Sequence, residues 1–192
     1  MQRFNETLEI IERDDKKLFK GYAIVFYDPN DPKTEYQLGK NIVERVSPSA
    51  VDGLIDGEVD TLLTVNHDKS WSLGCKSQEL TLFRDNRGLG FEHPIDPEDW
   101  QHQATYNKVL KRIYKGCSFV ANLKRDVWSK EGDKEVRTIT QLVKLDDVSI
   151  CARPAYSGTG VSVRDDDSTD YLDSYNRWKT EELIKKINQT NK

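Results

Sequence analysis

The stretch that organises this chain is Lys115-Gly116-Cys117-Ser118-Phe119-Val120-Ala121-Asn122-Leu123, where a glycine opens an alternating run of side chains. Alternation with a period of two is typical of a β-strand, because successive side chains point to opposite faces of the sheet. Cys117, Phe119, Ala121 and Leu123 share one face, and because all four are apolar they predict the core face. Ser118 then stands on the opposite face, which we expect to be accessible to a substrate.

Length and composition limit the class of protein. The chain has 192 residues, of which 36% are hydrophobic and 32% charged, so we expect one soluble globular domain with an appendage. A formal net charge of -4 lacks the large basic field that nucleic-acid binding normally shows. No apolar run approaches the ~18 residues of a membrane span, and the N-terminus has no hydrophobic signal core. We therefore expect a cytoplasmic protein with no nucleic-acid or membrane partner.

The cysteines argue against a disulfide framework and against a zinc site. Cys75, Cys117 and Cys151 are odd in number and widely spaced, without a Cys-x-x-Cys pair. We expect three reduced thiols, and we expect no metal or cofactor.

Before the central stretch, β-branched and aromatic runs predict strands, and clusters of Gly, Pro, Asn and Asp predict the turns between them. Strands are expected at residues 21–27, 42–46, 60–65, 78–84 and 88–92, the last two forming a hairpin. Ser47-Pro48 supplies an N-cap and a first-turn proline for a short helix that stops near Gly57. A longer helix is expected over residues 97–115, with Asp96 as its cap.

After Ser118 the pattern continues in strands. A polar turn at residues 129–134 predicts an antiparallel hairpin with a strand at 136–145, and a last short strand is expected at 161–163. Between them, alternation resumes at residues 147–150, with Asp147 and Ser149 on the face that we expect to be accessible. Many short strands with few helices favour a mainly β, α+β protein built on an antiparallel β-barrel with flanking helices.

The C-terminal part differs in composition. Residues 165–170 form an acidic block, which predicts a boundary between a folded unit of residues 1–164 and a C-terminal segment of residues 165–192. Seven apolar residues beyond it predict one stripe of an amphipathic helix. They are Tyr171, Leu172, Tyr175, Trp178, Leu183, Ile184 and Ile187. This helix is expected either to dock on the parent domain or to be a detachable, partner-binding tail.

A serine hydroxyl becomes a good nucleophile only when a base accepts its proton and a third group orients that base. Histidine is the natural base near neutral pH, and the chain has three. His93 precedes a proline at the end of a hairpin, and His102 is expected on the solvent face of a helix. His67 follows an apolar strand and is the better candidate, with Asp147 as the acid.

Short motifs then occur in a distinctive order between residues 20 and 164. They are Gly21-Tyr22-Ala23-Ile24-Val25-Phe26, Glu44-Arg45-Val46-Ser47-Pro48-Ser49-Ala50, Asn66-His67-Asp68, Leu73-Gly74, Gly88-Leu89-Gly90-Phe91, Gly116-Cys117-Ser118-Phe119, Asp147-Val148-Ser149 and Pro154-Ala155-Tyr156. Any one motif is weak, but the ordered set resembles the HK97-type capsid maturation (prohead) serine proteases of tailed bacteriophages, which are related to herpesvirus assemblins.

The resemblance implies a herpesvirus-protease-like barrel over residues 1–164 and a serine endopeptidase activity. It implies Ser118 as nucleophile, His67 as general base and Asp147 as the orienting acid. The family usually carries glutamate as the third catalytic residue, whereas this chain has aspartate, which is one methylene shorter. The neighbouring Asp146 is therefore an alternative to Asp147.

Two further positions bear on the pocket around the serine. Family members tend to have glycine where this chain has Val120, which changes the pocket beside the nucleophile. The oxyanion is expected to be stabilised by backbone amides near Ser118, or by Arg153 acting directly or through water.

The resemblance also implies partners and a location. The expected substrates are scaffolding protein and the N-terminal region of the major capsid protein, inside an assembling procapsid in the host cytoplasm. Self-cleavage and a homo-oligomer are further expectations. Two alternatives stay open: a thiol protease that uses Cys117, and a catalytically silent, scaffold-like assembly module.

Overall fold

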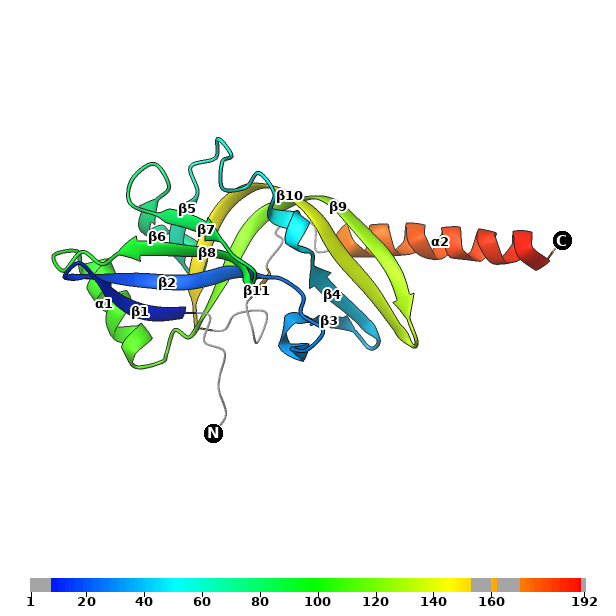
Figure 1. The fold of residues 1–192 in the computed structure, drawn as a ribbon, viewed down its shortest axis with the longest axis horizontal. Coiled ribbons are helices and arrows are strands. Elements are labelled where there is room, and N and C mark those ends of the chain that lie inside the picture. Colours follow the sequence, from blue (N-terminus) through cyan, green and yellow to red (C-terminus); the bar gives the residue numbers. More distant parts are fainter. Residues whose placement is uncertain (1–7, 153–159, 162–169, 191–192) are drawn as a thin grey trace.

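The computed structural model describes residues 8–152, 160–161 and 170–190, which form two β-sheets and two α-helices (Figure 1). The strands are β1 (Leu8–Arg13), β2 (Lys16–Val25), β3 (Tyr36–Gly39), β4 (Ile42–Val46), β5 (Leu62–Val65), β6 (Asp68–Cys75), β7 (Thr81–Arg84), β8 (Gly88–Pro94), β9 (Gly116–Glu131), β10 (Lys134–Cys151) and β11 (Gly160–Val161). The helices are α1 (Trp100–Leu110) and α2 (Asp170–Thr190), with short 3₁₀ helices at Pro32–Thr34 and Pro48–Val51. Figure 1 shows α1 and α2 at opposite ends of the molecule.

The first sheet has the strand order β1-β2-β8-β7, and every pair in it is antiparallel. The second has the order β11-β9-β10-β4-β3, while β5 also pairs with β10, and β6 pairs with β5. Within the described residues the strands do not close into a barrel. The mainly β, α+β class is therefore confirmed, whereas the expected herpesvirus-protease-like barrel is not.

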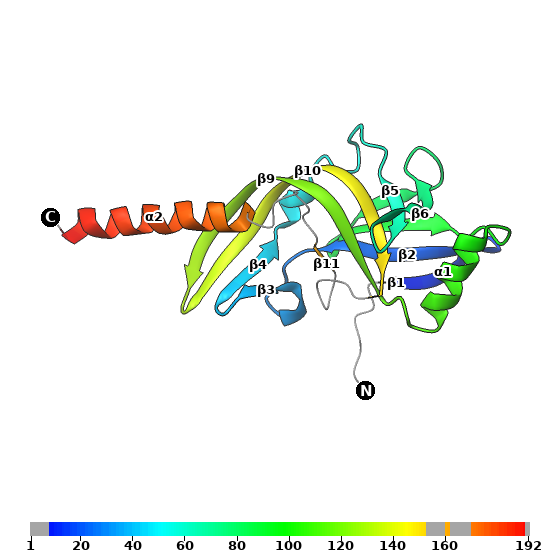
Figure 2. The same cartoon turned by 180° about the vertical axis from the view of Figure 1, so that it is seen from behind.

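The β9–β10 hairpin is the longest feature of the fold. It pairs from Glu131 and Lys134 at the turn to Gly116 and Cys151 at the open end. Several register shifts interrupt the ladder, and such bulges bend strands. Figures 1 and 2 show the resulting bent hairpin, with β5 and β6 beside one end and β3 and β4 beside the other. The predicted strands at 136–145 and 147–150 are thus one continuous strand.

Strand β10 has parallel neighbours at both of its ends. Its residues 135–139 pair with β4, and its residues 147–150 pair with β5. β10 is therefore the element that joins the two ends of the second sheet. Its residues 147–150 lie between β5 on one side and the part of β9 that carries Ser118 on the other.

The core face predicted for the central stretch is confirmed. Cys117, Phe119 and Ala121 are fully buried, and Phe119 lies in one apolar cluster with residues of both sheets, such as Phe19 and Ile150. Burying a large apolar side chain such as that of Phe119 contributes about 1.5–3 kcal/mol, so this position helps to hold the two sheets together.

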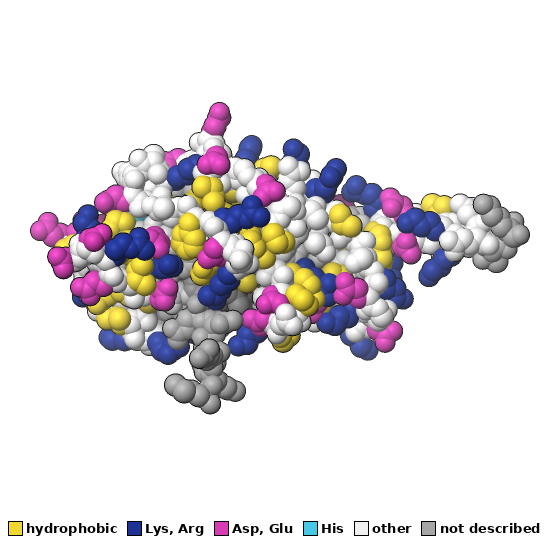
Figure 3. All heavy atoms as spheres, in the orientation of Figure 1, with side chains coloured by type: hydrophobic (Ala, Val, Ile, Leu, Met, Phe, Trp, Pro, Cys, Tyr) yellow, Lys and Arg dark blue, Asp and Glu magenta, His cyan; other side chains and the backbone are white. Residues whose placement is uncertain are grey.

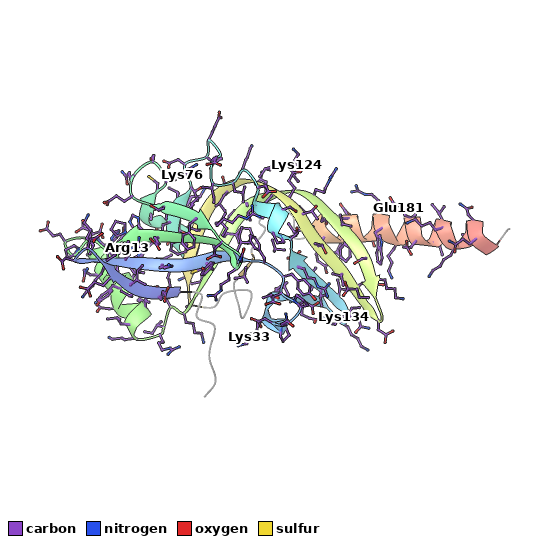
Figure 4. The ribbon with its side chains drawn as sticks, in the orientation of Figure 1. Arg13, Lys33, Lys76, Lys124, Lys134 and Glu181 are labelled. Atoms are coloured by element: carbon purple, nitrogen blue, oxygen red, sulfur yellow. The ribbon has the colours of Figure 1, made fainter. Side chains whose placement is uncertain are left out.

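Charged side chains join the far end of the hairpin to β4. Arg45 on β4 binds Glu131 at 2.7 Å and also contacts Glu35. Lys134, which is labelled in Figure 4, binds Glu35 at 2.8 Å. Beside them, the buried Arg137 of β10 binds Glu44 at 3.0 Å. Removing one partner of such a buried pair typically costs about 3–5 kcal/mol, because the other charge is left uncompensated.

Several predicted boundaries are confirmed and others are wrong. The β7–β8 hairpin is present, and the short helix begins at Pro48, with Ser47 accepting a hydrogen bond from Ser49 N. Helix α1 is shorter than predicted, because Asp99 caps it by accepting from the main-chain amides of Gln101 and His102.

Asp96, the predicted cap of α1, instead accepts from the amide of Glu98 in the preceding loop. The β1–β2 hairpin was not predicted, and β11 begins one residue before the expected last strand.

The apolar residues of helix α2 differ in how far they are covered. Tyr175 and Trp178 are half-buried against Trp128 of β9, with ring centroids 5.1 and 5.9 Å away. Leu183 and Ile187 are 60% and 51% exposed on the part that projects from the body (Figure 1). Tyr175 and Trp178 thus dock the helix, whereas the aliphatic residues nearer its C-terminal end are exposed.

Among the described helices, neither is both long and apolar enough to cross a membrane. Figure 3 shows acidic and basic side chains interspersed over the visible face rather than gathered into a field of one sign.

Candidate active site

The predicted serine lies on β9, directly opposite Ser149 of β10 in the antiparallel ladder. Its side chain is on the face away from the core cluster, as alternation requires. The expectation that this face is accessible is wrong, since Ser118, Asp147 and Ser149 are only 3%, 2% and 0% exposed. The turn between β5 and β6 accounts for part of this burial, because its side chain and main chain contact this face.

That turn carries the predicted base. Asn66-His67 joins β5 to β6, and the flanking Val65 and Asp68 are paired. Both turn residues have positive φ, 52° at Asn66 and 60° at His67. A two-residue loop with two positive φ angles is typical of a type I′ turn, whose twist matches that of the strands that it joins. His67 is therefore held in a tight turn rather than at the strand end that the sequence predicts.

Three predicted residues meet in one chain of hydrogen bonds. His67 Nε2 lies 2.8 Å from Ser118 Oγ, and His67 Nδ1 lies 2.8 Å from Asp147 Oδ1. A carboxylate can only accept, so Nδ1–H donates to Asp147 and Nε2 is left free to accept from the serine hydroxyl. This is the tautomer in which an imidazole can take the serine proton.

The two alternatives at neighbouring positions have different environments. Asp146 is exposed, because alternation turns it away from Asp147, and the acid that contacts His67 is Asp147. Cys117 is fully buried, and that burial raises the pKa of its thiol well above the ordinary value. A protonated, buried thiol is a poor nucleophile, since the thiolate is the reactive form.

The other two histidines lie in the interior, so the expected solvent position of His102 is wrong. His102 Nε2 donates to Leu73 O at 2.7 Å, and its Nδ1 accepts from Asp96 N at 2.9 Å. The ring of His93 lies 5.4 Å from that of His102, and burial lowers the pKa of His93. These contacts are typical of histidines that have a structural role.

Among the described residues, no group of three or more His, Cys, Asp or Glu side chains could hold a metal ion. Cys75, Cys117 and Cys151 are free thiols. Arg153, an expected oxyanion donor, lies outside the described residues. The sequence reasoning missed Asn66 and Ser149, although each stands in a motif that also contains a predicted site residue.

A buried serine, a partly exposed imidazole and a buried carboxylate in one hydrogen-bonded chain are typical of serine hydrolases that use an activated hydroxyl. A family model described as caudovirus prohead serine protease matches residues 6–174, which is most of the chain and includes all three residues. The chain belongs to this family, as the ordered motifs predicted.

No curated protein and no solved structure matches the chain. Family membership identifies a capsid maturation protease of tailed phages, which acts within the procapsid in the host cell and associates with phage capsid proteins.

Proposed function

We propose that this chain is a serine endopeptidase in which Ser118 is the nucleophile, His67 the general base and Asp147 the acid that orients the base. One observation carries the proposal: Ser118 Oγ, both nitrogens of His67 and Asp147 Oδ1 form a continuous chain with two 2.8 Å contacts. Family membership supports peptide-bond hydrolysis as the reaction.

In this mechanism Ser118 Oγ attacks the carbonyl carbon of the scissile bond while His67 Nε2 takes the hydroxyl proton. The Asp147 carboxylate stabilises the imidazolium that forms, and Nε2 then protonates the leaving amine. Water cleaves the acyl-enzyme by the same steps, with His67 again as the base. General base catalysis of this kind typically contributes about 10²–10⁴-fold in rate. We assign the oxyanion to main-chain amides near Ser118 or to Arg153.

We propose scaffolding protein and the N-terminal region of the major capsid protein as the substrates, with the chain itself as a further one. Family membership supports capsid-associated substrates. The division into a protease domain of residues 1–164 and a C-terminal segment of residues 165–192 is part of the proposal, with α2 docked through Trp128 in this structure. The family relationship also favours a herpesvirus-protease-like barrel, to which the two sheets would contribute.

The two alternatives have less support. A thiol protease would need Cys117 to leave the core and lose its proton, whereas the side chain is fully buried. A catalytically silent module would not require the His67 tautomer with its proton on Nδ1, which the contact with Asp147 selects.

Co-expression with the neighbouring capsid and scaffolding proteins, followed by intact-mass analysis, tests the proposal. The parent chain should release defined fragments, and the Ser118→Ala variant should release none while melting at the same temperature. Cleavage by Ser118→Ala at the parent rate would refute the assignment of the nucleophile.

A further inference from the structure

Ser149 makes two hydrogen bonds that the proposed mechanism does not use. Its Oγ accepts from the main-chain amide of His67 at 2.9 Å and donates to Thr64 O at 3.3 Å. The side chain is completely buried. Through these hydrogen bonds, the Ser149 side chain connects β10 to β5 and to the turn that carries His67.

The turn needs such a link because its conformation is unfavourable for the residue that it carries. A non-glycine residue with φ near 60° in the left-handed region costs about 1–2 kcal/mol, and such strain persists only where the surroundings impose it. Glycine would relieve the strain at position 67, but glycine has no imidazole. The main chain of His67 must therefore be held by contacts from outside the turn.

Apart from the contact of His67 with Ser118 on β9, the described hydrogen bonds that join the turn to the second half of the chain come from the end of β10 and from the residue after it. Asn66 N donates to Ile150 O at 3.0 Å, and Ala152 N donates to Asn66 Oδ1 at 3.2 Å. These two hold Asn66, whereas the contact from Ser149 Oγ holds His67 itself. The described contact to the main-chain amide of His67 thus depends on one side chain.

The two holding groups of His67 lie two residues apart on the same face of β10. Asp147 binds the imidazole at Nδ1, and Ser149 binds the backbone amide of the same residue. Ser149 is also the ladder partner of Ser118, so it lies level with the nucleophile. Holding both ends of one side chain fixes the position of Nε2 relative to Ser118 Oγ.

We propose that Ser149 is a positioning residue that holds the left-handed turn of His67 and so keeps Nε2 within hydrogen-bond distance of Ser118. The inference rests on the proposed role of His67 as the general base. Misplacing a reacting group by about 1 Å costs about 10²-fold in rate, so losing this anchor affects turnover more than substrate binding.

The test compares Ser149→Ala with a matched control, Thr61→Val. The Thr61 hydroxyl is also buried and also joins the β5 region to β10, by donating to Leu145 O at 2.8 Å, but it makes no contact with His67. We expect both variants to lose some thermal stability. Only Ser149→Ala should show a fall in kcat, of about 10- to 100-fold, with KM unchanged.

Two further measurements separate positioning from simple structural support. The rate at which a fluorophosphonate probe acylates Ser118, followed against pH, should reach a lower plateau in Ser149→Ala and an unchanged plateau in Thr61→Val. Ser149→Thr, which keeps the hydroxyl, should recover most of the lost plateau.

Unchanged kcat and plateau in a folded Ser149→Ala variant would overturn the inference, and so would an equal fall in Thr61→Val. If Ser149→Ala does not fold, Ser149→Cys replaces it, because sulfur is a weaker acceptor and the same fall in plateau is expected. His67→Ala separates the two levels of the argument. If His67→Ala stays active, the proposed function fails, whereas if it is inactive while Ser149→Ala is fully active, only the positioning role fails.

Discussion

Replacing Asp147 by Asn tests the acid most directly, because it keeps the shape of the side chain and removes its charge. The carboxylate is 2% exposed and lies 2.8 Å from His67 Nδ1. At an effective dielectric constant of ~20, unit charges about 3–4 Å apart attract by about 4–6 kcal/mol. This attraction arises only when the imidazolium forms, so its loss raises the barrier and corresponds to about 10³- to 10⁴-fold in kcat.

A second effect acts in the same direction. The amide of an asparagine can donate to Nδ1, which moves the imidazole proton to Nε2 and prevents this atom from accepting from Ser118. We therefore expect Asp147→Asn to fold normally and to lose about 10⁴-fold in the rate of cleavage. Asp147→Glu restores the charge and should recover part of the rate.

The assay is cleavage of co-expressed capsid and scaffolding proteins, together with the rate of Ser118 acylation by a fluorophosphonate probe. Asp146→Asn is the matched control, because it removes a neighbouring charge that is exposed and should leave the rate unchanged. The reasoning is refuted if Asp147→Asn keeps activity within tenfold of the parent. A collapse in Asp146→Asn alone would make Asp146 the third member.

Three other predictions concern Cys117, His93 and α2. Cys117→Ala should keep full activity and lose about 1 kcal/mol of stability, because it shortens a buried side chain that takes no part in the proton transfer. Denaturant unfolding measures the stability and a cleavage assay the activity; an inactive but folded variant would favour the thiol alternative. Stability should decrease as pH falls below about 6.5, because burial lowers the pKa of folded His93 and the unfolded chain then binds more protons. Melting curves from pH 8 to 5 should show a smaller decrease in His93→Phe, and an identical decrease would count against His93 as its source. Truncation after Arg164 uncovers Trp128 but leaves the contacts of His67 intact, so we expect a lower melting temperature with retained peptide cleavage; an insoluble product would mean that α2 belongs to the protease domain.

Local periodicity predicted how the site residues within each single strand are oriented. Alternation placed Ser118 opposite Cys117 and Phe119, and it placed Asp147 and Ser149 on one face. The meeting of His67 with these residues has no local signal, because it depends on the parallel pairing of β5 with β10. The His67–Asp147 contact joins residues 80 positions apart in the chain.

Burial was the part that sequence patterns predicted least well. Alternation separates two faces of a strand, but it cannot tell whether another segment covers the polar face, as the Asn66-His67 turn does here. The same reason explains His102, whose helix packs on β6 so that Leu73 accepts from its ring. The helical period of the apolar residues in α2 likewise cannot tell which of them are covered: Trp178 packs on Trp128, whereas Leu183 and Ile187 are exposed.

The position of β10 in the chain has a consequence for when activity can begin during synthesis. Ser118 and His67 are translated before β10, the strand that carries Asp147 and Ser149. β4 and β5 are also translated well before β10, which is their parallel partner. Pairings between such distant segments form slowly, since the loops between them must be closed first. A nascent chain that ends before Asp147 therefore contains Ser118 and His67 but lacks both Asp147 and Ser149. In the proposed mechanism, β10 must leave the ribosome before the chain can cleave another protein.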